Sequence, residues 1–147
     1  MNYEEIQEIV NYGKTLNVLF IEDNDEVREQ ITKLLTNFFP NIITACDGEQ
    51  GLTYYDQFFK QKCKYFDLVI TDINLPKKDG IDLAQEILYN NPNQLILVIS
   101  AYTEVSKHQK LEDIGIYKFI QKPIDYNNFL FTIRDTINKL KVSQEKL

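Results

Sequence analysis

Short runs of apolar residues alternate along the chain with longer segments in which apolar residues recur every three or four positions. The runs are rich in Val, Ile and Leu and mostly unbroken by polar residues, a pattern typical of parallel strands buried on both faces of a sheet. The predicted strands comprise residues 16–21, 42–45, 66–70, 95–99 and 117–120. A segment with helical periodicity follows each of them, so we expect successive strand–helix units.

The helices are predicted by their apolar faces and by the residues that start them. The faces of the first and last of these helices consist of Val27, Ile31, Leu34, Leu35 and Phe38, and of Phe129, Leu130, Ile133, Ile137 and Leu140. The candidate N-caps are Asn24 or Asp25, Asp47, Asp79, Thr103 and Asp125. Gln50, three residues after Asp47, indicates a capping box. The alternation predicts an α/β fold with a doubly wound parallel sheet, in which the carboxyl ends of the strands line one crevice.

Two segments deviate from this regular pattern. Residues 104–114 form the weakest predicted helix, because their apolar stripe is thin, and we expect this helix to shift more easily than its neighbours. His108 lies in its polar part, so we expect a solvated side chain. Residues 1–14 carry Ile6, Ile9 and Val10 and predict an amphipathic turn or two that ends near Gly13.

Composition and charge narrow the classes of function. With 147 residues and 44% hydrophobic content, the chain can form one domain with a buried core. The net charge of −6 argues against a broad nucleic-acid surface. Cys46 and Cys63 lack metal-ligand spacing, so we expect buried, reduced thiols. The N-terminus does not resemble a signal peptide, and no segment has the roughly 20 apolar residues of a membrane span, so we expect a cytoplasmic protein.

Side chains that can bind a cation or a phosphoryl group stand at the ends of four predicted strands. Asp72 follows the third run, and Glu22 and Asp23 follow the first. Three carboxylates at adjacent strand ends repel one another unless a cation such as Mg²⁺ neutralises them. Ser100 and Lys122, at the ends of the fourth and fifth runs, are suitable donors to phosphoryl oxygens. Each residue alone has an ordinary explanation, but together they predict a phosphoryl-accepting aspartate with a metal site.

From about residue 16 to residue 140 the chain resembles a response-regulator receiver domain, the phosphoacceptor domain of two-component signalling. The motifs that carry the resemblance are Val18-Leu-Phe-Ile-Glu-Asp23, Leu68-Val-Ile-Thr-Asp72, Leu97-Val-Ile-Ser100 and Phe119-Ile-Gln-Lys-Pro123. The resemblance implies a flavodoxin-like (βα)5 fold with strand order 2-1-3-4-5. It also implies a receiver domain over residues 15–141, an N-terminal extension or linker over 1–14, and a tail over 142–147.

The same resemblance implies a role for each motif residue. Asp72 would accept a phosphoryl group from the phosphohistidine of a sensor kinase, from a phosphotransfer protein or from a small phosphodonor. The implied ligands of Mg²⁺, with Mn²⁺ as an alternative, are Glu22, Asp23, Asp72 and the backbone carbonyl of Asn74. Ser100 and Lys122 would bind the phosphoryl group, and the Lys122–Pro123 peptide bond would be cis.

Signalling would then depend on Ser100 and on Phe119, three residues before the lysine. Ser100 would move toward the phosphoryl group and Phe119 would turn inward, which changes the surface of the fourth helix, fifth strand and fifth helix. Tyr117 lies on the same strand face, but the spacing to Lys122 favours Phe119. Implied partners are the kinase, a downstream protein or output domain, and a second copy in a phosphorylation-linked homodimer. Direct binding to nucleic acid or to a membrane is not expected. Glu22, where Asp is commoner, and Phe119, which lacks a tyrosine hydroxyl, depart from the usual pattern.

Two other functions are compatible with parts of this pattern. A phosphatase of the haloacid-dehalogenase type also uses an aspartate nucleophile after a strand, but it requires a second Asp where this chain has Asn74. A phosphorylation-independent adaptor would be expected if the site residues were missing. The chain is either a single-domain regulator or the receiver of a longer protein.

Overall fold

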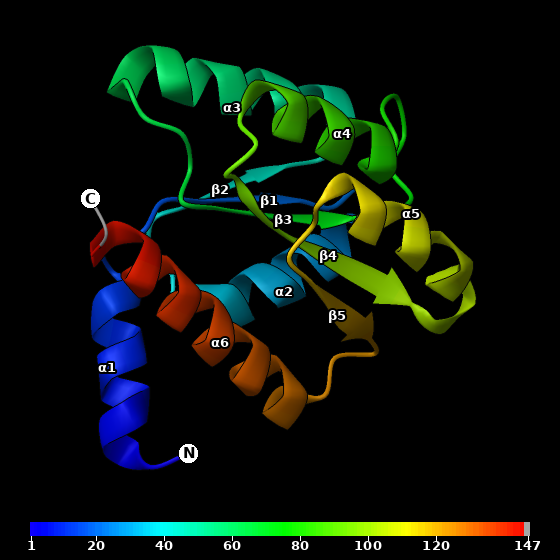
Figure 1. The fold of residues 1–147 in the computed structure, drawn as a ribbon. Coiled ribbons are helices and arrows are strands. Elements are labelled where there is room, and N and C mark those ends of the chain that lie inside the picture. The colour runs from blue at the N-terminus through cyan, green and yellow to red at the C-terminus, as the bar shows by residue number, and fades with distance from the viewer. Residues whose placement is uncertain (146–147) are drawn as a thin grey trace.

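A five-stranded parallel sheet forms the middle layer of the molecule, as the computed structural model of residues 1–145 shows (Figure 1). Its strands are β1 (Val18–Ile21), β2 (Ile42–Ala45), β3 (Leu68–Asp72), β4 (Leu95–Ala101) and β5 (Lys118–Lys122). Their order is β2-β1-β3-β4-β5, and every pairing is parallel. The predicted fold class and strand order are therefore confirmed. β3 is central, so its last residue lies in the middle of one sheet edge.

Helices cover both faces of the sheet (Figure 1). They are α1 (Tyr3–Gly13), α2 (Asp25–Thr36), α3 (Gly48–Lys62), α4 (Gly80–Asn90), the 3-10 helix η1 (Tyr102–Lys107), α5 (His108–Ile114) and α6 (Tyr126–Glu145). Side chains alternate between the faces of a strand, which divides the core into two parts. Val18 and Phe20 of β1 pack with α1, α2 and α6, whereas Leu19 and Ile21 pack with α3, α4 and α5. The predicted apolar faces of the helices after β1 and β5 lie in the first part.

The predicted N-caps are confirmed at four helices. Asn24, rather than Asp25, caps α2 by accepting a hydrogen bond from the Val27 backbone N–H at 3.0 Å. Asp47, Asp79 and Asp125 cap α3, α4 and α6 in the same manner. The capping box at Asp47 is only approximate, because the Gln50 side chain accepts from the Cys46 N–H at 2.7 Å instead of from the cap residue itself.

The predicted helix over residues 104–114 is the element that differs most from expectation. Its first half is the 3-10 helix η1, which begins before Thr103, and only its second half is α-helical. Thr103 is therefore not an N-cap. The N-cap residue is Ala101, and Glu104, three residues later, accepts a hydrogen bond from the Ala101 N–H at 2.8 Å.

The two edge strands are less buried than predicted. Only Ala45 of β2 and Ile120 of β5 are buried, whereas β1 and β3 are buried throughout. An edge strand has a neighbour on one side only, which explains why a short apolar run was not sufficient for burial on both faces. Burial of the cysteines was also wrongly predicted: Cys46 is half-buried and Cys63 is exposed, both as free thiols.

The N-terminal helix α1 lies beside the C-terminal end of α6 (Figure 1). α1 is longer than the predicted turn or two, contacts α6 and buries Ile9. α6 continues to Glu145, past the predicted domain boundary at residue 141, and residues 146 and 147 of the predicted tail lie outside the described residues. Among the described residues, no helix is long and apolar enough to cross a membrane.

Candidate functional site

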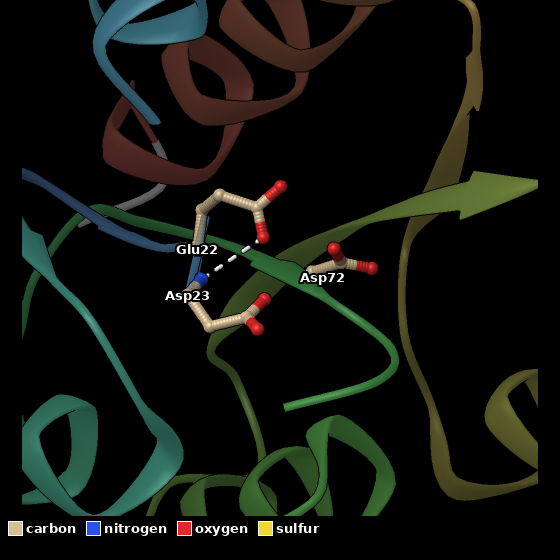
Figure 2. Close-up of side chains that lie close together, drawn as sticks. All are labelled: Glu22, Asp23 and Asp72. Carbon is tan, nitrogen blue, oxygen red and sulfur yellow. Dashed lines mark hydrogen bonds between the residues drawn. The ribbon is translucent and has the colours of Figure 1, made fainter. Parts of the chain in front are cut away.

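Asp72, Glu22 and Asp23 form an acidic cluster at the carboxyl edge of the sheet (Figure 2). Asp72 is the last residue of β3, and the other two directly follow β1, which is the neighbouring strand. Each residue offers one carboxylate oxygen within 4.8 Å of the others. Oxygen donors of this kind are the ligands that hard divalent cations prefer. The cluster can therefore hold a metal ion.

Glu22 is the most strongly perturbed acid of this cluster. Its side chain is only 2% exposed. Burial, then a hydrogen bond and charge repulsion with Asp72, raise its pKa to about 7, although attraction to Lys122 lowers it. A carboxylate in such a place gains most from a cation, because a positive charge removes both the repulsion and the unfavourable burial of a negative charge.

Lys122, the last residue of β5, supplies the positive charge that the site itself contains. Its Nζ atom lies 2.8 Å from Oδ2 of Asp72 and 3.3 Å from Oε1 of Glu22. Burial tends to lower the pKa of this ammonium group, but the contacts with Asp72 and Glu22 outweigh burial and the net shift is upward. The lysine is therefore charged and anchored beside Asp72. The peptide bond that follows it, to Pro123, is cis.

The loop after β3 is folded tightly around Asp72. The Ile73 N–H donates to Oδ1 of Asp72 at 2.7 Å, and the Gly80 N–H donates to the Ile73 carbonyl at 2.8 Å. A Cβ atom at position 80 would lie 2.2 Å from the Asp72 carbonyl oxygen, so only glycine allows this close return of the chain. The loop therefore fixes the direction of the Asp72 carboxylate.

Asn74 links this loop to η1. Its side chain donates to Oε2 of Glu104 at 2.5 Å and accepts from Nζ of Lys107 at 2.7 Å. Glu104 is 7% exposed, so its carboxylate is shielded from water while it holds both Asn74 and the Ala101 N–H. Sequence reasoning missed Glu104 and Lys107, because the bonds that define them join segments about thirty residues apart.

Ser100 lies near the end of β4, Phe119 lies within the neighbouring strand β5, and His108 contacts both. The buried Ser100 hydroxyl donates to the Ala101 carbonyl at 3.1 Å and lies 2.7 Å from Nε2 of His108. The His108 ring stacks on the Phe119 ring with centroids 3.8 Å apart and an angle of 13° between the planes. The prediction of a solvated His108 was therefore wrong. A single histidine in a polar segment gives no sequence signal for such contacts.

The structure thus brings Asp72 together with Glu22, Asp23 and Lys122, and places Ser100 against His108, whose ring stacks on Phe119. A buried carboxylate beside an ammonium group and two further acids can take part in phosphoryl transfer, in which a cation and a lysine offset the charge of the transferred group.

Comparison with known proteins agrees with a role in phosphoryl transfer. The family described as "Response regulator receiver domain" matches residues 18–134. Chemotaxis protein CheY of Treponema pallidum is 32% identical over 85% of this chain and 85% of its own length. Transcriptional regulatory protein ZraR of Klebsiella oxytoca is 26% identical over 90% of this chain, but the match spans 28% of its length, and that with protein RcaC of Microchaete diplosiphon spans 18%.

Solved structures agree with the sequence relatives. The N-terminal domain of an uncharacterized protein from Wolinella succinogenes has a TM-score of 0.72 and 29% identity, covering 88% of this chain and 98% of that one. A response regulator receiver domain protein from Clostridium thermocellum, at 24% identity, has the same fold with a TM-score of 0.73 over 86% of this chain and 98% of that one. The match over residues 18–134, together with this fold, shows that the chain belongs to the response regulator receiver domain family, the signalling domain of two-component systems.

Proposed function

We propose that Asp72 accepts a phosphoryl group in a reaction that depends on Mg²⁺. The observation that carries this proposal is the contact of the buried Asp72 carboxylate with Nζ of Lys122, within a cluster of three acids at the edge of a parallel sheet. Ligands of open α/β sheets bind at this edge. A lysine and a metal ion together can balance the charge of a phosphoryl group placed beside three carboxylates.

The reaction is a displacement at phosphorus. An oxygen of Asp72 attacks the phosphorus of a phosphohistidine, a P–O bond forms, the P–N bond breaks, and the leaving imidazole nitrogen takes up a proton. With acetyl phosphate the P–O bond to acetate breaks and acetate leaves as the anion. Lys122 is placed to hold an oxygen of the transferred group by a charge-assisted hydrogen bond. Attack of water on the phosphorus would later release phosphate and restore the carboxylate.

The metal-binding residues in this proposal are Glu22, Asp23, Asp72 and the backbone carbonyl of Asn74. Mg²⁺ suits such a set of oxygen ligands, and Mn²⁺ would bind the same groups. When bound, the ion offsets the negative charge that the phosphoryl group brings to the site. The raised pKa of Glu22 supports the fit, because burial, and then the contacts with Asp72, disfavour its ionised form, and a cation would offset both effects.

The phosphoryl group would also attract Ser100, whose hydroxyl would become its second protein donor, and Phe119 would turn into the space that Ser100 leaves. This movement would alter the surface formed by α5, β5 and α6. We propose that the kinase or phosphotransfer protein delivers the phosphoryl group at the acidic edge, and that a downstream protein, an output domain or a second copy of the chain reads the altered surface. The nearly full-length match to CheY supports a single-domain regulator, and the partial matches to ZraR and RcaC support a domain of a longer protein.

We retain the domain division of 1–14, 15–141 and 142–147 as part of this proposal, with residues 1–14 as an extension rather than a linker, because α1 packs on α6. A cytoplasmic location fits the two free thiols, since thiols persist in a reducing compartment. The phosphatase alternative is less well supported, because the Asn74 side chain, where that class has an acid, is bound to Glu104 and Lys107.

The test is intact-mass analysis after incubation with acetyl phosphate, with and without Mg²⁺. Wild-type protein should gain about 80 Da, one phosphoryl group, only when Mg²⁺ is present. Asp72→Asn should abolish the gain, whereas Asp56→Asn, a matched change at an exposed carboxylate of α3, should preserve it. An unmodified wild type under rapid sampling, or an adduct that survives in Asp72→Asn, would refute Asp72 as the acceptor.

A further inference from the structure

His108 is the first residue of α5 and the chain's single histidine. Its imidazole contacts both residues that are proposed to move in signalling. Nε2 lies 2.7 Å from the Ser100 hydroxyl oxygen, and the flat face of the ring lies on Phe119 at 3.8 Å between centroids. A single side chain thus connects the β4 hydroxyl that is proposed to hydrogen-bond the phosphoryl group with the aromatic ring of β5.

The hydrogen bonds of Ser100 are fully used in this arrangement. A serine hydroxyl has one hydrogen to donate, and its two neighbours here are the Ala101 carbonyl and Nε2 of His108. Either the hydroxyl donates to the carbonyl and accepts from an Nε2–H group, or it donates to an unprotonated Nε2. Neither choice leaves a hydrogen for an oxygen beside Asp72. Ser100 must therefore give up an existing bond before it can donate to a phosphoryl group.

Phe119 is restrained by the same ring. The two rings are nearly parallel, with 13° between their planes, so each covers much of the other's apolar face. If Phe119 turns toward the space beside Ser100, this stacking is lost. The movements of Ser100 and Phe119 thus break contacts with one residue.

The backbone of His108 is held in place through η1. Glu104, four residues earlier, binds the Ala101 N–H and the Asn74 side chain, and Lys107 binds Asn74 as well. These bonds tie the start of α5 to the loop that follows Asp72. Side-chain hydrogen bonds therefore hold the start of α5, and with it the imidazole, near the loop after Asp72.

We propose that His108 is a positioning residue that holds the Ser100 hydroxyl and the Phe119 ring away from their phosphorylated positions. The proposal rests on the proposed function of Asp72. The contacts of His108 with Ser100 and Phe119 stabilise the unphosphorylated arrangement, and phosphorylation must break them. A residue at position 108 that lacks the ring nitrogen or the flat ring would remove one of these contacts. Phosphorylation at Asp72 would then become easier.

The first test separates the two contacts by substitution. His108→Phe keeps a flat ring and removes the nitrogen, and His108→Gln keeps a polar side chain and removes the ring. Each variant loses one contact that stabilises the unphosphorylated arrangement. Acetyl phosphate should therefore phosphorylate each variant between about two and ten times faster than wild type. Lys110→Ala, at an exposed position of the same helix, should match wild type. Rates equal to or below wild type in both His108 variants would overturn the proposal.

The second test is independent of phosphorylation and asks whether the bond between His108 and Ser100 exists in solution. The single imidazole gives one pair of ring ¹⁵N resonances, which report the bonding of Nε2 without ambiguity. In unphosphorylated protein, Ser100→Ala should shift the Nε2 resonance, and an unchanged resonance would show that the bond is absent in solution and the proposal wrong. If wild type takes up no phosphoryl group, the function proposed for Asp72 fails, while the ¹⁵N result still decides whether His108 holds Ser100.

Discussion

The ionised form of Glu22 is strongly disfavoured, because this nearly inaccessible acid lies beside a second carboxylate. The positive charge of Lys122 offsets only part of this effect. Its pKa, raised from 4.5 to about 7, means that the folded protein holds a proton there that the unfolded chain has already lost. A proton and a metal ion therefore compete for the same side chain near neutral pH.

Mg²⁺ binding should become tighter as the pH rises through about 7. Only ionised Glu22 can act as a ligand, so the dissociation constant should be about tenfold lower at pH 8 than at pH 6. Titration with Mg²⁺ by calorimetry at the two pH values measures the difference. In Glu22→Gln the affinity should be weaker and its pH dependence flatter; an equally steep dependence in the variant would assign the proton to another group.

The same shift has a consequence for stability in the absence of metal. Because the folded pKa lies above the unfolded one, the contribution of Glu22 to stability is fully present below pH 4.5 and is lost as the pH rises to about 7. The free energy of unfolding without Mg²⁺ should therefore fall over this range in wild type. The fall should be smaller in Glu22→Gln, as urea titrations would show.

Among the residues of the site, those that end strands were predicted from the sequence, whereas those that lie on η1 and α5 were missed. Asp72, Ser100 and Lys122 each terminate an apolar run, and parallel strands bring such ends to one edge. The contacts of His108 and Glu104 depend on how the chain turns between β4 and α5. The pattern of apolar residues does not predict this turn. The contacts of His108 and Glu104 could therefore not be predicted from the sequence.

Among the elements, η1 is the one whose form depends most on side-chain bonds. It is short, its N-cap residue Ala101 has no polar side chain, and the Glu104 carboxylate instead accepts from the N–H of Ala101 itself. The strands were predictable because their apolar runs are continuous. Thr103 was a plausible cap by residue type, but the Glu104 carboxylate occupies the Ala101 N–H that begins the turn.

Glu104→Ala should loosen the connection between η1 and the loop after β3. The substitution leaves the Ala101 N–H and the Asn74 amide without their acceptor, so the free energy of unfolding should fall by about 1–3 kcal/mol. Urea denaturation measures the change. Glu104→Gln keeps an acceptor oxygen and should lose less, and equal stability of all three proteins would show that the bonds contribute nothing.

At the scale of the whole molecule, the sheet divides the core into two parts that are built differently. One part is closed by α3, α4 and α5, and the other by α2 and α6 with α1 added at one end. The alternation of strands and helices predicted this arrangement, since right-handed crossovers leave few other topologies. The docking of α1 was not predictable, because its partner α6 lies at the opposite end of the sequence.

Ile9→Ala tests whether α1 belongs to the folded domain. Ile9 is 5% exposed within the core part that includes α6, so its truncation should lower the free energy of unfolding by about 2 kcal/mol or more. Glu8→Ala, at an exposed position of the same helix, is the control. A change at Ile9 of no more than about 0.5 kcal/mol, measured by urea denaturation, would instead identify residues 1–14 as a detachable linker.

The central place of β3 has a further consequence for how the backbone opens locally. β3 pairs with β1 on one side and β4 on the other, so its amide hydrogens should exchange with solvent only when the whole domain unfolds. η1, at the end of β4, is joined to the rest largely by side chains and should exchange through brief local openings. The phosphoryl group would then be carried by a slowly exchanging strand, whereas η1, which connects the loop after Asp72 to the start of α5, would exchange faster. Backbone opening at the phosphorylation site and beside the responding surface would therefore occur on separate timescales.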